Sequence, residues 1–134
     1  MKNGLIIIDI DSFDSYIFSK IGLLEPAICI VEYNNSIPPW INYQDLEGEI
    51  FLRCSLKGFN RIGKEQGYNL VVATTTNAIF LRKELCAKHN IITCEPEESY
   101  LYEEQAKNHS MFGTTVASYM MTSYPVFVNC VQML

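Results

Sequence analysis

Three aspartates, Asp9, Asp11 and Asp14, lie at the end of the apolar stretch 5–10. Clustered carboxylate oxygens suit a divalent cation, and a single carboxylate can act as the general base for a hydroxyl nucleophile. Alternatively, Asp11 or Ser12 caps a following helix and Asp14 stabilises its positive end. We expect Asp9 and Asp11 to be catalytic or metal-binding and Asp14 to bind substrate, with the helix-start alternative left open.

A second apolar stretch, residues 27–33, also ends in polar side chains, namely Glu32 and Asn34. Ligands of open α/β sheets bind beyond the carboxyl ends of the strands. We therefore expect Glu32 to join the aspartates as a catalytic residue and Asn34 to orient substrate. Trp40 follows two prolines in the next loop, where it either closes over a ligand or anchors the loop to the core.

These residues need a sheet to position them. The runs 5–10 and 27–33 lack polar alternation, which is typical of parallel strands buried on both faces. Phe13, Tyr16, Ile17, Ile21 and Leu24 recur at helical spacing between them and predict a helix with one apolar stripe. A strand–helix–strand unit follows, which places both sets of carboxylates at one edge of the sheet.

The middle of the chain predicts a mixed sheet. A loop over 34–54 precedes a helix over 55–66, with Ser55 as its cap and Gly67 in a left-handed conformation at its end. Strands over 68–74 and 78–82 are joined by so short a turn that they must be antiparallel. Further along we predict a helical turn over 83–89, helices starting near 95 and over 111–122, and a strand over 126–131. The fold class is therefore α/β, with three layers.

Length, net charge and cysteine content limit the classes of protein to which this chain can belong. The chain has 134 residues, which suits one domain, and a net charge of −5 with scattered basic residues, which argues against nucleic acid. The sequence contains no apolar run long enough to span a membrane and no signal peptide pattern. Five cysteines without a Cys-x-x-Cys pair favour the reducing cytoplasm, and Cys29 is expected in the core.

The order of several motifs resembles the FkbM-type methyltransferases, a class I family that uses S-adenosylmethionine. The motifs lie at 8–16, 26–34, 54–56, 62–70 and 76–82. The resemblance implies a Rossmann-like sheet entered halfway, with strands equivalent to the fourth to seventh of seven and the last one antiparallel between its neighbours. It also implies that the Glu-Tyr-Asn sequence at 32–34 lines the substrate side.

The resemblance covers residues 1–90 of one truncated domain, with 91–134 as a helical and strand extension. The glycine-rich turn and the acidic ribose-binding residue of the family have no counterpart in this sequence. S-adenosylmethionine is thus implied by resemblance only, and we expect a chain that is inactive alone or is a fragment. It would act with a partner or with a missing N-terminal half.

Two other functions stay open. A sheet that begins at an internal strand exposes that strand's edge, which favours a homodimer or a partner subunit with no catalytic role. An apolar strand ending in Asp-x-Asp also opens the haloacid-dehalogenase phosphatases, and residues 71–74 resemble their second motif. In that class the first aspartate attacks phosphorus, although Ser12-Phe13 stands here where Gly-Thr is usual.

Overall fold

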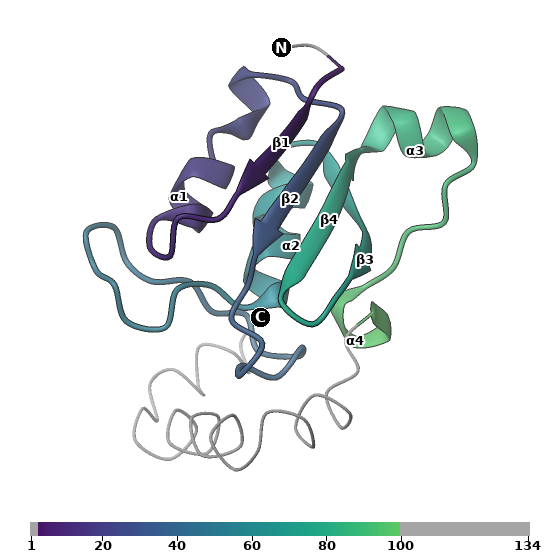
Figure 1. Ribbon diagram of the computed structural model, residues 1–134. Helices are drawn as coiled ribbons and strands as arrows, with labels where there is room; N and C mark the ends of the chain where they lie inside the picture. The colour runs from purple at the N-terminus through teal and green to yellow at the C-terminus, as the bar shows by residue number, and fades with distance from the viewer. Residues whose placement is uncertain (1–2, 100–134) are drawn as a thin grey trace.

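The computed structural model describes residues 3–99, which form a four-stranded sheet and its helices (Figure 1). The strands are β1 (Leu5–Ile8), β2 (Ile28–Glu32), β3 (Tyr68–Ala73) and β4 (Asn77–Arg82). The helices are α1 (Asp14–Phe18), the 3-10 turn η1 (Ile21–Leu23), α2 (Leu56–Glu65), α3 (Lys83–His89) and α4 (Pro96–Ser99). The sequence predictions at 111–122 and 126–131 lie outside the described residues.

The sheet has the order β1-β2-β4-β3 and is mixed. β1 and β2 are parallel, with Leu5 opposite Ile28, whereas β4 runs antiparallel to both β2 and β3. The short turn between β3 and β4 therefore makes an antiparallel hairpin, as predicted. Because β4 lies between β2 and β3, the three strands β1, β2 and β3 all point the same way.

The core lies between one face of the sheet and helices α1 and α2. Phe18 packs against Phe59 and Phe80 with ring centroids 5.8 and 5.0 Å apart. Side chains of β2 and β4 alternate between this buried face and the opposite one, and Cys29 is fully buried as expected. Apolar side chains on one stripe of α2, including Leu56, face the same core.

The local signals around α2 are confirmed. The Ser55 hydroxyl accepts a hydrogen bond from the Gly58 amide at 2.9 Å, which is the expected N-terminal cap. Gly67 follows the helix with φ +86°, a conformation that a residue with a Cβ rarely adopts. These two residues set the ends of α2, and they therefore set where β3 begins.

The prediction for the first strand was partly wrong. β1 ends at Ile8 and is an edge strand among residues 3–99, with Leu5 and Ile7 exposed by 53% and 64%. Only Ile8 is fully buried in this strand. A strand with an apolar sequence can have its second face either covered or open to solvent. The sequence alone therefore does not establish burial on both faces. Helix α2 lies behind the strands, and no described helix crosses the face in front of β1 and β2 (Figure 1).

The first helix also differs from its prediction. The expected continuous helix stops at Phe18, and η1 follows after a break. Consequently Phe18 and Ile21 are buried, while Tyr16 and Ile17 of the predicted stripe are 46% and 40% exposed. The helix begins after Phe13 with no side-chain cap, so neither Asp11 nor Ser12 caps it.

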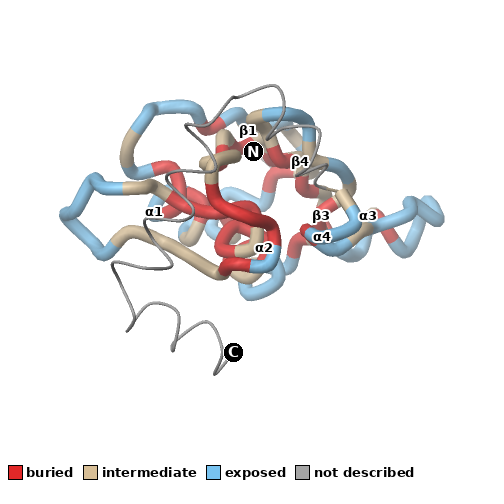
Figure 2. The backbone as a smooth tube through the Cα atoms, turned by 90° about the horizontal axis from the view of Figure 1, so that it is seen from below, coloured by how far each residue is buried: buried red, intermediate tan, exposed pale blue. Residues whose placement is uncertain are grey.

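The loop between β2 and α2 is long, as predicted, and the Asp45 carboxylate makes four hydrogen bonds within it. Asp45 accepts hydrogen bonds from the backbone N–H groups of Phe51, Leu52 and Arg53 at 2.7–3.0 Å, and from the Tyr43 hydroxyl at 2.7 Å. The tip of the loop, residues 46–51, is exposed (Figure 2). The base of the loop is thus fixed beside the ends of β1 and β2.

Candidate functional site

Three carboxylates meet where β1 and β2 end. One oxygen from each of Asp9, Asp11 and Glu32 lies within 4.8 Å of the others. The predicted proximity of these three residues is therefore confirmed. Parallel pairing explains this, since it places the carboxyl ends of β1 and β2 at the same edge of the sheet. Asp9 and Asp11 are exposed, whereas Glu32 is half-buried.

Arg53 completes the cluster and was missed by the sequence analysis. Its guanidinium lies 3.2 Å from Asp11 and 2.9 Å from Glu32, and it donates a hydrogen bond to the latter. Arg53 has φ +63°, an uncommon conformation for a residue other than glycine, and the hydrogen bond from its amide to Asp45 helps to hold it. Neither the contact nor the conformation has a local signal in the sequence.

Burial raises the pKa of the Glu32 carboxyl above its usual value, and the neighbouring charge of Asp9 raises it further. The positive charge of Arg53 acts in the opposite direction but does not cancel these effects. Like charges this close disfavour full ionisation. Glu32 therefore keeps its proton to a higher pH than an unperturbed glutamate does.

Asp14 lies apart from this cluster in function. It is buried, and its carboxylate accepts hydrogen bonds from the Ile10 and Ser12 amides, both at 3.1 Å. These bonds close the turn between β1 and α1, in which Asp11 has φ +60°. Asp14 thus stabilises the turn that presents Asp11, and its carboxylate oxygens are already engaged there rather than turned to a substrate.

Asn34 and Trp40 do not join the carboxylates either. The Asn34 side chain donates to the Leu52 carbonyl at 3.0 Å and accepts from the Ser36 amide at 2.9 Å, so it ties the two ends of the long loop together. Trp40 is 45% exposed beside Ile41, which belongs to a small second core. The Asn34 side chain is therefore engaged within the loop, and Trp40 lies half-exposed on it.

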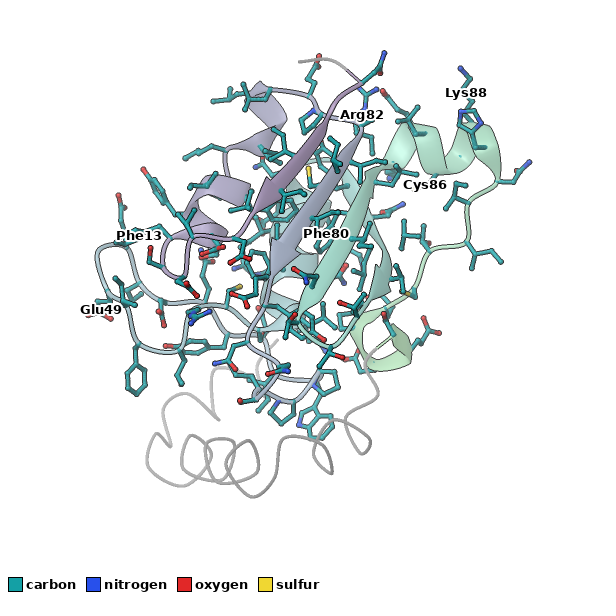
Figure 3. The ribbon with its side chains drawn as sticks, viewed as in Figure 1. Phe13, Glu49, Phe80, Arg82, Cys86 and Lys88 are labelled. Atoms are coloured by element: carbon teal, nitrogen blue, oxygen red, sulfur yellow. The ribbon has the colours of Figure 1, made fainter. Side chains whose placement is uncertain are left out.

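A groove of about 440 Å³ runs beside the cluster, between the start of α1 and the loop tip. Phe13 and Glu49 come from these two segments, on either side of the groove (Figure 3). Ile10, Tyr16 and Leu46 add apolar surface, and Ser12 is the neighbour of Asp11 in the chain. The acidic residues that line the groove are those of the loop, including Glu49, whereas the three clustered carboxylates lie outside its lining. The groove therefore combines apolar and acidic side chains, which suits a partly apolar substrate.

The cysteines of the described residues are outside the site and are poor nucleophiles. All four, Cys29, Cys54, Cys86 and Cys94, are free thiols. Burial raises the pKa of Cys29 to about 12, and it raises the pKa of Cys54 strongly as well. Because the thiolate is the reactive form, these two residues serve as core side chains.

The carboxylates offer two kinds of chemistry. Oxygen ligands from three acidic side chains could hold a divalent cation, with Arg53 supplying the balancing positive charge in the present arrangement. A carboxylate such as Glu32 could instead act as a general base for a substrate hydroxyl. Comparison of the chain with models of known families, with curated proteins and with solved structures gave no match. Among residues 3–99, no helix is long and apolar enough to cross a bilayer.

Proposed function

We propose that this chain is the substrate-facing half of a class I, S-adenosylmethionine-dependent methyltransferase, similar to the FkbM type. In this proposal the chain supplies acidic residues that orient and deprotonate the methyl acceptor. The half that binds the cofactor comes from a missing N-terminal segment or from a partner chain.

The observation that carries the proposal is the strand order β1-β2-β4-β3 with β4 antiparallel between β2 and β3. The resemblance implied four strands equivalent to the last four of the family sheet, with the final one inserted antiparallel between its neighbours. Parallel β1 and β2, with a hairpin strand returning between β2 and β3, give that order.

The position of the acidic cluster also supports the proposal. Asp9 and Asp11 follow β1, and Glu32 ends β2, at the edge where open α/β sheets bind their ligands. In the proposed reaction Glu32 takes the proton of an acceptor hydroxyl held in the neighbouring groove, while Asp9 and Asp11 orient the acceptor directly or through a divalent cation. Methyl transfer to that oxygen needs the sulfonium group that the cofactor supplies.

Cofactor binding tests the proposal most directly. Titration calorimetry of the chain with S-adenosylmethionine should give no saturable heat, because the sequence contains no glycine-rich turn to hold the cofactor. The DNA upstream of the Met1 codon should encode a strand, a glycine-rich turn and a helix, and the chain extended by that segment should bind S-adenosylmethionine. Micromolar binding by the present chain, or no binding by the extended one, would refute the proposed division of labour.

A matched pair of variants separates cofactor binding from the acceptor site in the extended chain. Glu32→Gln keeps the size of the side chain but removes the base, so methyl transfer should fall at least tenfold while cofactor affinity stays unchanged. Glu65→Gln is the control, because Glu65 is exposed on α2 and pairs only with Arg61 in the described structure. Equal losses in the two variants would argue against a role for Glu32.

The exposed edge of β1 favours a second candidate, a non-catalytic homo-oligomer or partner subunit. β1 has a strand partner on one side only among the described residues, and such an edge can pair with another chain. Light scattering should then give a dimer. A monomer at high concentration would count against this assembly.

The phosphatase alternative, with Asp9 as its nucleophile, has weaker support, because Ser12-Phe13 follows Asp11 where Gly-Thr is usual in that class. Turnover of an aryl phosphate with magnesium, abolished in Asp9→Asn, would favour it over methyl transfer. The cytoplasm remains the compartment we propose, on the strength of the free thiols.

A further inference from the structure

One face of the sheet carries apolar side chains that the described helices leave largely uncovered; α3 reaches it only at one corner, where Cys86 contacts Asn69. The strand register groups these side chains into two rows across the sheet. One row is Leu5, Ile28, Leu81 and Asn69, and the other is Ile7, Ile30, Ile79 and Val72. Leu5, Ile7 and Val72 are exposed by 53%, 64% and 42%, and the others are half-buried. Seven of the eight side chains are aliphatic, so this open face is unusual for a protein surface.

We propose that the C-terminal segment of this chain, residues 111–134, packs on the open face and completes the core. The segment contains no Asp, Glu, Lys or Arg, since Lys107 is the last such residue of the sequence. Its apolar residues include Phe112, Val116, Tyr119 and Met120, which fall on one stripe if residues 111–122 are helical. Packing an uncharged apolar segment on an uncovered apolar face removes both surfaces from water, which is favourable.

The end of the described chain lies close to the open face. The Ser99 hydroxyl accepts a hydrogen bond from the Ala73 amide at 2.6 Å, which ties the end of α4 to the end of β3. Val72, the neighbour of Ala73, belongs to the open face. The described chain therefore ends at one edge of the surface that the segment would cover.

The length of the chain is sufficient. Residues 100–110 can extend over roughly 36 Å at about 3.3 Å per residue, whereas four strands are only about 14 Å wide between the outer strands. A helix of twelve residues is about 18 Å long, so it can cross the whole sheet. A tether of this kind also keeps the segment at a local concentration in the millimolar range, which favours it over a second copy at ordinary concentrations.

Thiol labelling of the full chain tests this proposal. Ile7→Cys places a thiol at the most exposed position of the open face, and Leu23→Cys places one on η1, where Leu23 is 85% exposed. Labelling with N-ethylmaleimide is followed at each introduced cysteine by peptide mapping, because the native cysteines are present. We expect Cys at position 7 to react at least tenfold more slowly than Cys at position 23.

Two further variants link any protection to the segment. In the Ile7→Cys chain, Val116→Asp places a charge on the apolar stripe and should restore fast labelling, whereas Ser118→Asp lies on the other side of that stripe and should leave labelling slow. Circular dichroism verifies that both variants are folded. If Val116→Asp unfolds the chain, the test rests on the chains with an unaltered C-terminal segment. There, the labelling rate of Cys at position 7 is compared with that of Cys at position 23.

Three results would overturn the proposal. Fast labelling at position 7 in the full chain would mean that the face is open or reserved for another protein. Protection that is lost on dilution would identify a second copy as its occupant. Protection that survives Val116→Asp as fully as Ser118→Asp would exclude this stripe as the contact. None of these results bears on cofactor binding, so the proposal stands or falls separately from the proposed function.

Discussion

Replacement of Arg53 should reveal how far one guanidinium stabilises the acidic cluster. Arg53→Met keeps the length of the side chain and its left-handed backbone but removes the partner of Asp11 and Glu32. The Arg53 side chain is 40% exposed, Asp11 is 77% exposed and Glu32 is 26% exposed. Exposed ion pairs contribute about 0.2–1 kcal/mol each, so the pair with Asp11 lies near the lower limit and the pair with Glu32 near the upper one. We expect the free energy of unfolding to fall by about 1 kcal/mol at pH 7 and low salt.

The same reasoning fixes the dependence on salt and pH. At 0.5 M salt the screening length falls to roughly 4 Å, so less than half of the loss should remain. The folded-state pKa of Glu32 is raised, which means that its ionisation disfavours the folded state and that its contribution to stability decreases as pH rises from about 4.5 through this raised pKa. Arg53 opposes that decrease, and its removal should therefore cost more at pH 7 than at pH 4.

Urea unfolding followed by circular dichroism measures these differences. Lys88→Met is the matched control, because it removes one positive charge from an exposed position on α3 and should change stability by less than about 0.5 kcal/mol. In a chain that already carries Asp11→Asn and Glu32→Gln, Arg53→Met should have little effect. A loss that is equal at low and high salt, or that persists in this neutral background, would refute the electrostatic explanation.

Three further predictions follow from the contacts of the described residues. Ser55→Ala should lower the free energy of unfolding by about 1–2 kcal/mol in urea, because α2 loses its cap at the Gly58 amide; an unchanged midpoint would contradict the capping role. Asp14→Ala should cost about 1–3 kcal/mol, because two backbone N–H groups lose a charged acceptor; a neutral effect would return Asp14 to the list of substrate ligands. Millimolar calcium should raise the melting temperature of Arg53→Met more than that of the parent chain, and adding Glu32→Gln should abolish the difference; equal shifts would exclude cation binding at the cluster.

Features that depend on neighbouring residues could be deduced from the sequence. The cap at Ser55, the left-handed Gly67 and the tight turn before β4 each have a short-range cause, and they fix the ends of α2, β3 and β4. The convergence of Asp9 and Glu32 needed one more step, namely the parallel pairing of the strands that carry them. That step follows from the strand–helix–strand order alone.

Features that depend on distant contacts could not be deduced. Arg53 lies 21 residues from Glu32 in the sequence, and its place in the cluster is set by the hydrogen bonds that Asp45 makes across the loop. The predicted length of the first helix was wrong for a related reason. The break after Phe18 lets its ring enter the aromatic core, and a single apolar stripe in the sequence does not predict this break. In both cases packing against residues far along the chain overrode the local pattern.

Three different parts of β1 carry the three proposals, so each proposal can be tested independently of the others. Asp9 follows its carboxyl end and joins the acidic cluster, whereas Ile7 points to the open face and the outer backbone edge has no strand partner among residues 3–99. Removing the Asp9 charge at the end of β1 leaves the backbone edge and the open face unaltered. Covering the open face, in turn, leaves Asp9 exposed. Asp9→Asn should therefore change chemistry without changing the labelling of a thiol at position 7 or the oligomeric state. If it changed either of them, the cluster would have to be regarded as part of the contact surface rather than as a separate site.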